Sequence, residues 1–121
     1  MRSKEQELFN KGLKYFNNKN YYDAHEEWEE LWINHKLKDA LLIQGLIQLA
    51  VGYFHITNSN IKGSLSLFNK SIPKFEKYFI NEREIDVAYI LKQVSLTIKD
   101  LNSIPNTSKF NWSLAPRFKL K

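Results

Sequence analysis

Cysteine is absent from the 121 residues, and glycine and proline are scarce, with four and three copies. The absence of cysteine excludes disulfide bonds, a thiolate metal site and a cysteine nucleophile, and it fits a reducing compartment. We therefore expect a cytoplasmic protein. The scarcity of glycine and proline, and the lack of long alternating apolar and polar runs before residue 108, predict an all-α fold.

Targeting and membrane-spanning segments are also not evident. Residues 1–7 are mostly charged or polar, so we expect neither a signal peptide nor a transit peptide. The longest uncharged run, residues 40–61, is interrupted by two glutamines and a histidine. We interpret this run as a buried core helix and expect no membrane partner.

The composition that remains is that of one folded domain. Hydrophobic residues make up 43% of the chain and aromatic residues 14%, against 26% charged residues. A chain of this length can bury a substantial core without disulfides or a structural metal, but it has no room for a second domain.

Positive charge dominates, with a formal net charge of +5. Residues 1–35 contain five basic and seven acidic residues, net −2, and residues 36–121 contain thirteen basic and six acidic residues, net +7. The basic residues form no cluster of four or more and match no nucleic-acid-binding motif. We therefore interpret the charge as solvated surface and expect no specific nucleic-acid partner.

The 3.6-residue periodicity of apolar residues predicts a bundle of about five antiparallel helices. The expected helices cover residues 4–18, 21–35, 39–57, 61–79 and 84–102, with a kink or break at Pro73 in the fourth. The third is apolar on every side, which predicts a central position surrounded by other helices. We expect residues 1–102 to form the bundle domain, and residues 103–121 to lie on it as an extended C-terminal tail.

A weak internal repeat occurs at an offset of 40 residues. It matches Gly12 with Gly52, Tyr15 with His55, Phe16 with Ile56, Ala24 with Ser64, Trp28 with Phe68 and Leu31 with Ser71. The spacing resembles that of tetratricopeptide-type hairpins, although that repeat is usually ~34 residues long and any two helical hairpins share some matches. The repeat predicts that the first and third helices pack side by side, with the second and fourth alongside them.

The stretch from Tyr21 to Trp32 combines a histidine, four glutamates and two tryptophans in one expected helix. On a helical wheel, His25 and Glu29 lie on the same side as the two tryptophans. Glu26 lies at the margin of this side, whereas the remaining acidic residues face solvent. The sequence therefore predicts a polar and aromatic front on this helix.

The third expected helix directs three polar side chains, Gln44, Gln48 and His55, to one side. In an antiparallel hairpin whose turn is centred near residue 36 or 37, paired residue numbers sum to about 73. This register places His25 opposite Gln48 and Glu29 opposite Gln44. We expect these groups to form a polar seam between the two helices.

Two interpretations of this seam are open. In the first, the polar groups hydrogen-bond to one another and to tryptophan N–H groups inside the fold. In the second, the seam opens as a cleft in which His25 and Glu29 serve as general acid and base. Gly45 and Gly52 border the seam and would let a ligand or a neighbouring helix approach the backbone.

His25 and Glu29 can also chelate a divalent metal ion, because they lie four residues apart on one helical face. A third ligand is harder to find. His55 lies seven residues from Gln48, ~10.5 Å along the helix axis. The metal interpretation therefore has two donors.

Several segments together resemble the bacterial and archaeal family called domain of unknown function 309. They are Phe9-Asn-Lys-Gly12, Tyr22-Asp-Ala-His-Glu26, Trp28-Glu29, Leu31-Trp32, Gln44-Gly-Leu-Ile-Gln48-Leu-Ala50, His55 and Lys62-Gly63. The resemblance spans about residues 8–75. It implies a small all-helical domain, in a family sometimes labelled as predicted metal-dependent hydrolases. By position, the resemblance implies that the signature residues are His25, Glu26 and Glu29, with Trp32, Gln44, Gln48 and His55 matching the rest.

We therefore predict a helical protein whose polar pocket binds a small molecule or supports metal-assisted hydrolysis. His25 and Glu29 are the candidate catalytic residues and metal ligands. The expected pocket also includes Glu26, Trp28, Trp32, Gln44, Gln48 and His55. The alternative is a non-enzymatic protein-interaction module, in which the polar seam specifies packing and the partner is another protein or a second copy of the chain.

Overall fold

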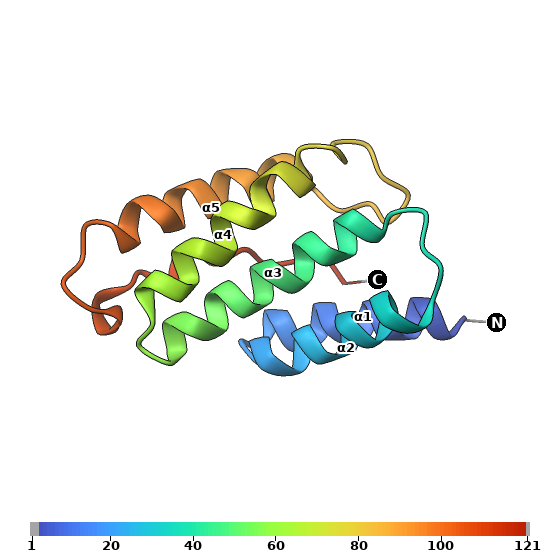
Figure 1. Cartoon of the computed structure of the whole chain (residues 1–121), viewed down its shortest axis with the longest axis horizontal. Helices are drawn as coiled ribbons and strands as arrows, with labels where there is room; N and C mark the ends of the chain where they lie inside the picture. The colour runs from blue at the N-terminus through green and yellow to red at the C-terminus, as the bar shows by residue number, and fades with distance from the viewer. Residues whose placement is uncertain (1–2, 121) are drawn as a thin grey trace.

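The computed structural model describes residues 3–120, which contain five α-helices and two short 3₁₀ helices (Figure 1). The helices are α1 (Lys4–Asn17), α2 (Tyr21–Asn34), α3 (Ala40–Thr57), α4 (Ile61–Phe75), α5 (Val87–Leu101), η1 (Thr107–Lys109) and η2 (Trp112–Leu114). The described residues contain no β-strand. The prediction of an all-α bundle of about five helices is confirmed.

Helix α3 lies in the middle of the bundle, between α2 and α4 (Figure 1). Contact with α1 is made near one end, where the rings of Phe16 and Tyr53 are 5.9 Å apart. The expected side-by-side packing of the first and third helices is therefore wrong, because α3 packs along α2 and α4 instead. The interior is aromatic, and its largest fully buried side chains are Trp28, Tyr53, Phe16, Phe68 and Phe75.

The segment between α4 and α5 is longer than the sequence predicted. Helix α4 ends two residues after Pro73, and α5 begins at Val87, so residues 76–86 form a loop. The Asn81 side chain holds this loop: its amide donates to the carbonyls of Tyr78 (3.0 Å) and Ile85 (2.9 Å), and its oxygen accepts from the Ile85 N–H (3.0 Å). These side-chain bonds to the backbone replace the helical ones, which explains the shortened helices.

The turn between α1 and α2 and the turn between α3 and α4 have the same geometry, at the predicted offset of 40 residues. Lys19 and Ser59 both have a positive φ, of 65° and 59°. The residue after each donates its N–H five positions back, to the Tyr15 and the His55 carbonyl, at 2.9 Å in both cases. The type of hairpin is not decided by this match, and the tetratricopeptide comparison stays a prediction.

Close helix contacts at glycine follow the same offset. A Cβ added at Gly12 would lie 2.0 Å from Trp28 of the next helix, and one added at Gly52 would lie 2.5 Å from Phe68. Gly45 lies against Phe75 in a looser contact of 3.3 Å. The glycines of α3 thus admit the side chains of α4 rather than border the polar seam.

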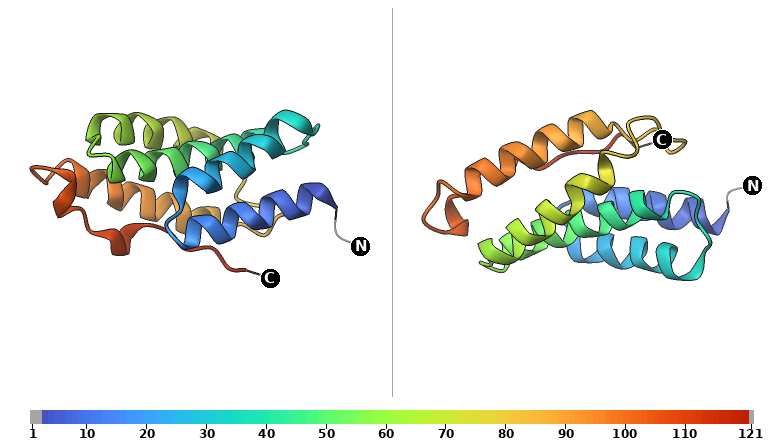
Figure 2. Two further views of the ribbon diagram at one scale, coloured as in Figure 1. Left: turned by 90° about the horizontal axis from the view of Figure 1, so that it is seen from below. Right: turned by 45° about the horizontal axis from the view of Figure 1, so that its top comes forward.

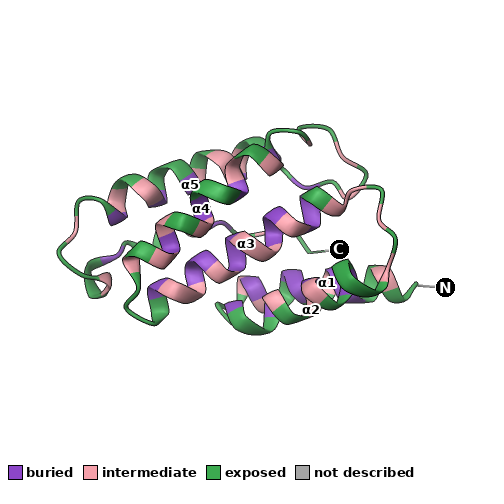
Figure 3. Cartoon of the chain, in the orientation of Figure 1, coloured by how far each residue is buried: buried purple, intermediate pink, exposed green. Residues whose placement is uncertain are grey.

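One side of α3 is not covered by other helices. Leu41, Gln44, Gln48, Val51 and His55 recur at helical spacing and are exposed or half-buried. Figure 3 shows partly exposed residues at intervals along α3. The expectation that α3 is surrounded on every side is therefore wrong. Among residues 3–120, α3 is the one helix that is long and apolar enough to cross a membrane. It is half buried inside the fold, and a buried core helix meets the same criteria of length and composition.

The tail beyond α5 crosses the bundle and ends beside α1 (Figure 2). Phe110 is buried, and the Phe118 ring lies 5.0 Å from that of Phe16. Asn17 binds the tail backbone twice: it donates to the Phe118 carbonyl and accepts from the Phe118 N–H, both at 2.8 Å. The tail is therefore bound to the C-terminal end of α1.

Candidate functional site

The candidate site from the sequence lies on the surface formed by α2 and the uncovered side of α3, which we call the α2–α3 face. We define it by Tyr22, His25, Glu26, Glu29, Trp32, Ile33, Leu41, Gln44 and Gln48. Tyr22 joins the two helices, because its ring lies 5.2 Å from both the His25 ring and the Phe54 ring of α3. None of the nine residues lies in the buried core.

His25 and Glu29 lie within hydrogen-bonding distance of each other on this face. The His25 Nε2 lies 2.7 Å from the Glu29 Oε2, and the His25 Nδ1 lies 3.1 Å from the Tyr22 carbonyl oxygen. A carbonyl and a carboxylate can only accept, so both bonds form together only when the ring is protonated on both nitrogens. In that arrangement, His25 has no nitrogen lone pair with which to bind a metal or accept a proton.

The glutamines of α3 do not complete the predicted network. Neither Gln44 nor Gln48 makes a side-chain hydrogen bond within residues 3–120, and the buried Gln48 Oε1 has no partner there. The ring pairs Tyr21–Tyr53 and Tyr22–Phe54 show that paired residue numbers sum to 74 and 76. The turn covers residues 35–39, so the register is shifted from the expected sum of about 73.

The other predicted pocket residues lie in different surroundings. Trp28 is fully buried, and its indole N–H donates to the Phe9 carbonyl at 3.2 Å. Glu26 and Trp32 are exposed. His55 lies at the far end of α3, where its Nδ1 is 3.5 Å from the Asn60 amide nitrogen. The structure thus brings together His25 and Glu29, and it separates Trp28 and His55 from them.

A metal would find two donors here. Residues 3–120 contain no group of three histidine, aspartate or glutamate side chains that could hold a metal ion. The His25–Glu29 pair could supply an imidazole nitrogen and a carboxylate oxygen only after its own hydrogen bonds open. The metal site stays a prediction with two ligands.

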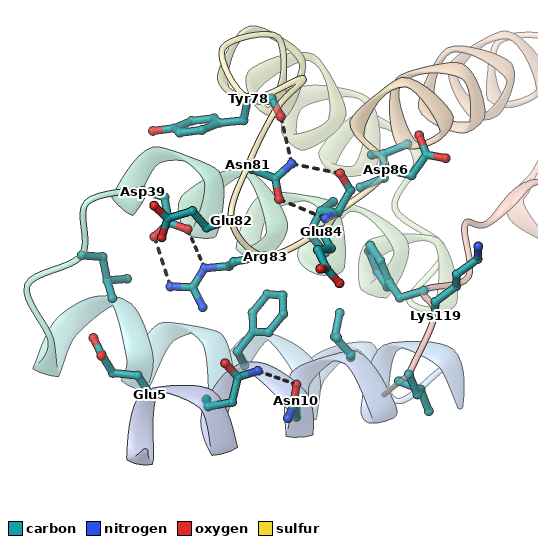
Figure 4. Close-up of a pocket in the computed structure, with 18 of the residues that line it drawn as sticks. Glu5, Asn10, Asp39, Tyr78, Asn81, Glu82, Arg83, Glu84, Asp86 and Lys119 are labelled. Atoms are coloured by element: carbon teal, nitrogen blue, oxygen red, sulfur yellow. Dashed lines mark hydrogen bonds and ion pairs between the residues drawn. The ribbon is translucent and has the colours of Figure 1, made fainter. Parts of the chain in front are cut away.

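A large cavity lies elsewhere in the molecule, away from the α2–α3 face. It has a volume of about 850 Å³ and is enclosed by α1, the turn before α3, the 76–86 loop with the start of α5, and the end of the tail (Figure 4). Arg83 and Asp39 form an ion pair in its wall, with Nε–Oδ2 at 2.5 Å and Nη2–Oδ1 at 3.1 Å. No predicted site residue lines it.

Sequence reasoning missed the pairing of Asp39 with Arg83, because the two residues lie 44 positions apart in the sequence, with α3 and α4 between them. Residues 76–79 and 84–86 of this loop were predicted as helix, so Arg83 was expected in a short link of four residues, 80–83. A helix-start signal was available at Asp86, whose side chain accepts from the Tyr89 N–H at 3.0 Å. It would have shortened the fifth helix and exposed the loop.

Comparison with protein families agrees with the predicted resemblance. Residues 9–67 match the family model described as "Domain of unknown function (DUF309)", which confirms the resemblance over nearly half of the chain. No curated protein and no solved structure matches the chain. The match covers α2 and α3 and ends within α4.

Proposed function

We propose that this protein is a non-catalytic interaction module whose α2–α3 face binds a basic amphipathic helix of a partner protein. The observation that carries the proposal is a row of exposed apolar side chains beside an acidic helix. A helix laid along a two-helix surface is a common mode of peptide recognition. The match to a family of unknown function is compatible with this proposal and does not select it.

The apolar part of the face lies mainly at the end near the 35–39 turn. Trp32, Ile33 and Leu41 are 40%, 64% and 38% exposed, and Tyr22 at the other end is 50% exposed. Large apolar side chains that gather on one surface mark interaction sites, and tryptophan and tyrosine are enriched there. Helix α2 has 14 residues, so a partner helix of about the same length, ~21 Å, would cover the face.

The acidic charge of α2 favours a basic partner helix. Residues 21–34 contain five acidic residues and no lysine or arginine, whereas residues 40–57 contain no acidic or basic residue apart from His55. The whole chain carries +5, so the remainder without the −5 of residues 21–34 carries +10. A partner with lysine or arginine beside its apolar stripe would pair with the exposed carboxylate of Glu26 on the face and with that of Glu30, which lies four residues further along α2 at the edge of the face.

Two matched peptides test the proposal. Both are amphipathic helices of about 18 residues with the same leucine stripe, one with lysine and one with glutamate on the polar face. We expect the lysine peptide to bind more tightly, to shift the fluorescence of Trp32 to shorter wavelengths, and to dissociate with added salt. Equal binding of both peptides would contradict the charge argument, and binding of neither would contradict the proposal.

Variants of the protein locate the binding. Glu26→Gln combined with Glu30→Gln should weaken the lysine peptide and leave the fold intact, because both side chains are exposed. Glu7→Gln combined with Glu76→Gln changes the charge equally away from the face and serves as the control. Sedimentation of the free protein shows whether a second copy occupies the face instead.

Small-ligand binding with metal-assisted hydrolysis is the second candidate function. It is favoured by one observation: the His25–Glu29 pair is reachable from solvent, with 47% of the Glu29 side chain exposed. Against it stands the position of both His25 nitrogens beside acceptor oxygens, because the protonated ring that donates to both of them has no lone pair for a metal. Metal found in the purified protein, and lost in His25→Ala, would support this candidate over the interaction module.

A further inference from the structure

Two large apolar side chains lie exposed next to each other on the 76–86 loop, and we call them the apolar tip. Phe79 is 60% exposed and Ile80 is 96% exposed, the highest value among the exposed large apolar side chains of residues 3–120. Figure 1 shows this loop, in yellow, projecting past the neighbouring ends of α4 and α5. Large apolar side chains that gather on the surface mark interaction sites.

The backbone on both sides of the apolar tip is held in place. The Tyr78 N–H donates to the last carbonyl of α4 at 2.9 Å, and the Asn81 side chain makes three hydrogen bonds to the Tyr78 and Ile85 backbone. Tyr78 and Asn81 line the cavity of about 850 Å³, whereas Phe79 and Ile80 do not. The loop therefore presents the apolar tip on its outer side, and binding would not have to order it.

Positive charge lies beside the apolar tip. The segment that leads to it, residues 61–80, contains four lysines and one glutamate, net +3. Lys70 and Lys77 are exposed. The acidic residues that follow the tip, at positions 82, 84 and 86, line the cavity, and there five acidic side chains are balanced by five basic ones. Outside the cavity, the surroundings of the tip are therefore basic.

From these observations we propose that the apolar tip inserts reversibly into the surface of a membrane that contains anionic lipids. Phe79 and Ile80 enter the boundary between the headgroups and the acyl chains, and Lys70 and Lys77 lie at the level of the lipid phosphates. A lipid layer can surround a protruding side chain on every side. A protein partner would have to supply a complete pocket for Ile80, because this chain covers almost none of it.

The proposed contact is separate from the other membrane and surface features of the chain. The expected absence of a membrane partner concerned a spanning helix, whereas this contact inserts two side chains of a loop. The apolar tip is also not part of the α2–α3 face. The membrane proposal and the peptide proposal can therefore fail independently.

Cosedimentation of the full chain with lipid vesicles tests the proposal. One set of vesicles contains phosphatidylcholine and phosphatidylserine, and the other contains phosphatidylcholine alone. We expect binding to the mixed vesicles that weakens with added salt, and roughly tenfold weaker binding to the neutral ones, because each lysine near an anionic surface contributes about a factor of five. Equal binding to both sets would overturn the proposal. Binding to neither would also overturn it and would leave the tip to a protein partner.

An apolar substitution locates the contact. Ile80→Ser should weaken binding to the mixed vesicles by roughly tenfold or more, because the buried isoleucine is lost, and should leave the lysine peptide bound as before. Ile33→Ser is the matched control, since Ile33 is 64% exposed on the α2–α3 face. It should weaken the peptide and leave vesicle binding unchanged. Unchanged vesicle binding in Ile80→Ser, or an equal loss in Ile33→Ser, would overturn the proposed contact.

A charge substitution tests the basic surroundings. Lys70→Gln combined with Lys77→Gln should weaken binding to the mixed vesicles by roughly tenfold and leave the neutral vesicles unaffected. Lys11→Gln combined with Lys14→Gln removes the same charge from exposed positions of α1 and is the control. Equal losses in the two double variants would show that net charge alone drives binding, which would overturn the proposed orientation.

Discussion

At the scale of single residues, the contact between Gly12 and Trp28 links the first two helices. The indole lies where a Cβ of residue 12 would be, so only glycine allows this approach. Trp28 is fully buried as a result, and its N–H reaches the Phe9 carbonyl. Trp28, which was expected to line a ligand pocket, thus packs against Gly12 inside the fold.

We predict that Gly12→Ala destabilises the fold, because the added methyl group would overlap the indole at 2.0 Å. The expected loss is about 1 to 3 kcal/mol in the free energy of unfolding, measured by urea denaturation. Gly45→Ala is the control: its methyl group would meet Phe75 at 3.3 Å, and alanine favours the helix. A loss in Gly45→Ala as large as in Gly12→Ala would contradict this account.

At the scale of elements, the tail behaves as a strap over the helices. Arg117 donates its backbone N–H to the Tyr89 hydroxyl at 3.1 Å, which holds the strap to α5. Asn17 holds it to the end of α1, and the Phe118 ring packs on Phe16 and, at 6.2 Å, on Trp28. The strap joins helices that are far apart in the sequence, and its end lines the cavity.

Asn17→Ala should release the end of the strap. The substitution removes both hydrogen bonds to Phe118, so we expect faster exchange of the Phe118 amide hydrogen and a loss of about 1 to 2 kcal/mol in the free energy of unfolding. Hydrogen exchange followed by NMR measures the first effect. The control is Asn18→Ala, at an exposed neighbouring position. Full protection of Phe118 in Asn17→Ala would argue against the strap.

At the scale of the whole molecule, Tyr53 of α3 is the shared centre. Its ring contacts those of Phe16, Tyr21 and Phe68 from three other helices, at 5.9, 5.5 and 4.7 Å, and that of Phe110 in the tail at 6.4 Å. Its hydroxyl lies 2.8 Å from that of Thr97 in α5. One side chain therefore touches all five helices, counting its own.

Alkaline pH should destabilise the molecule through this centre. Burial raises the pKa of the Tyr53 phenol and that of Tyr21 well above the ordinary value of about 10. Because the folded state favours the neutral phenols, their contribution to stability is complete below about pH 10 and is lost as the pH rises above it. Denaturation curves at increasing pH should show this decline.

Tyr53→Phe should make the alkaline decline less steep. At neutral pH the substitution should cost about 1 to 3 kcal/mol, because it leaves the buried Thr97 hydroxyl without its partner. Tyr22→Phe, at a half-exposed position, is the matched control and should change neither result. If the stability of Tyr53→Phe fell as steeply with rising pH, the loss would come from the ionisation of other groups.

The sequence by itself determined the number and order of the α-helices, because their apolar spacing and the scarcity of glycine and proline leave few alternatives, but it did not determine where α4 ends and α5 begins. It also placed His25 and Glu29 on one side of α2, since four residues make slightly more than one helical turn. The tertiary structure alone decided which surfaces meet. The hairpin register, the open side of α3 and the Arg83–Asp39 cavity all depend on contacts between distant residues, and the free energy of such contacts is not encoded in local spacing.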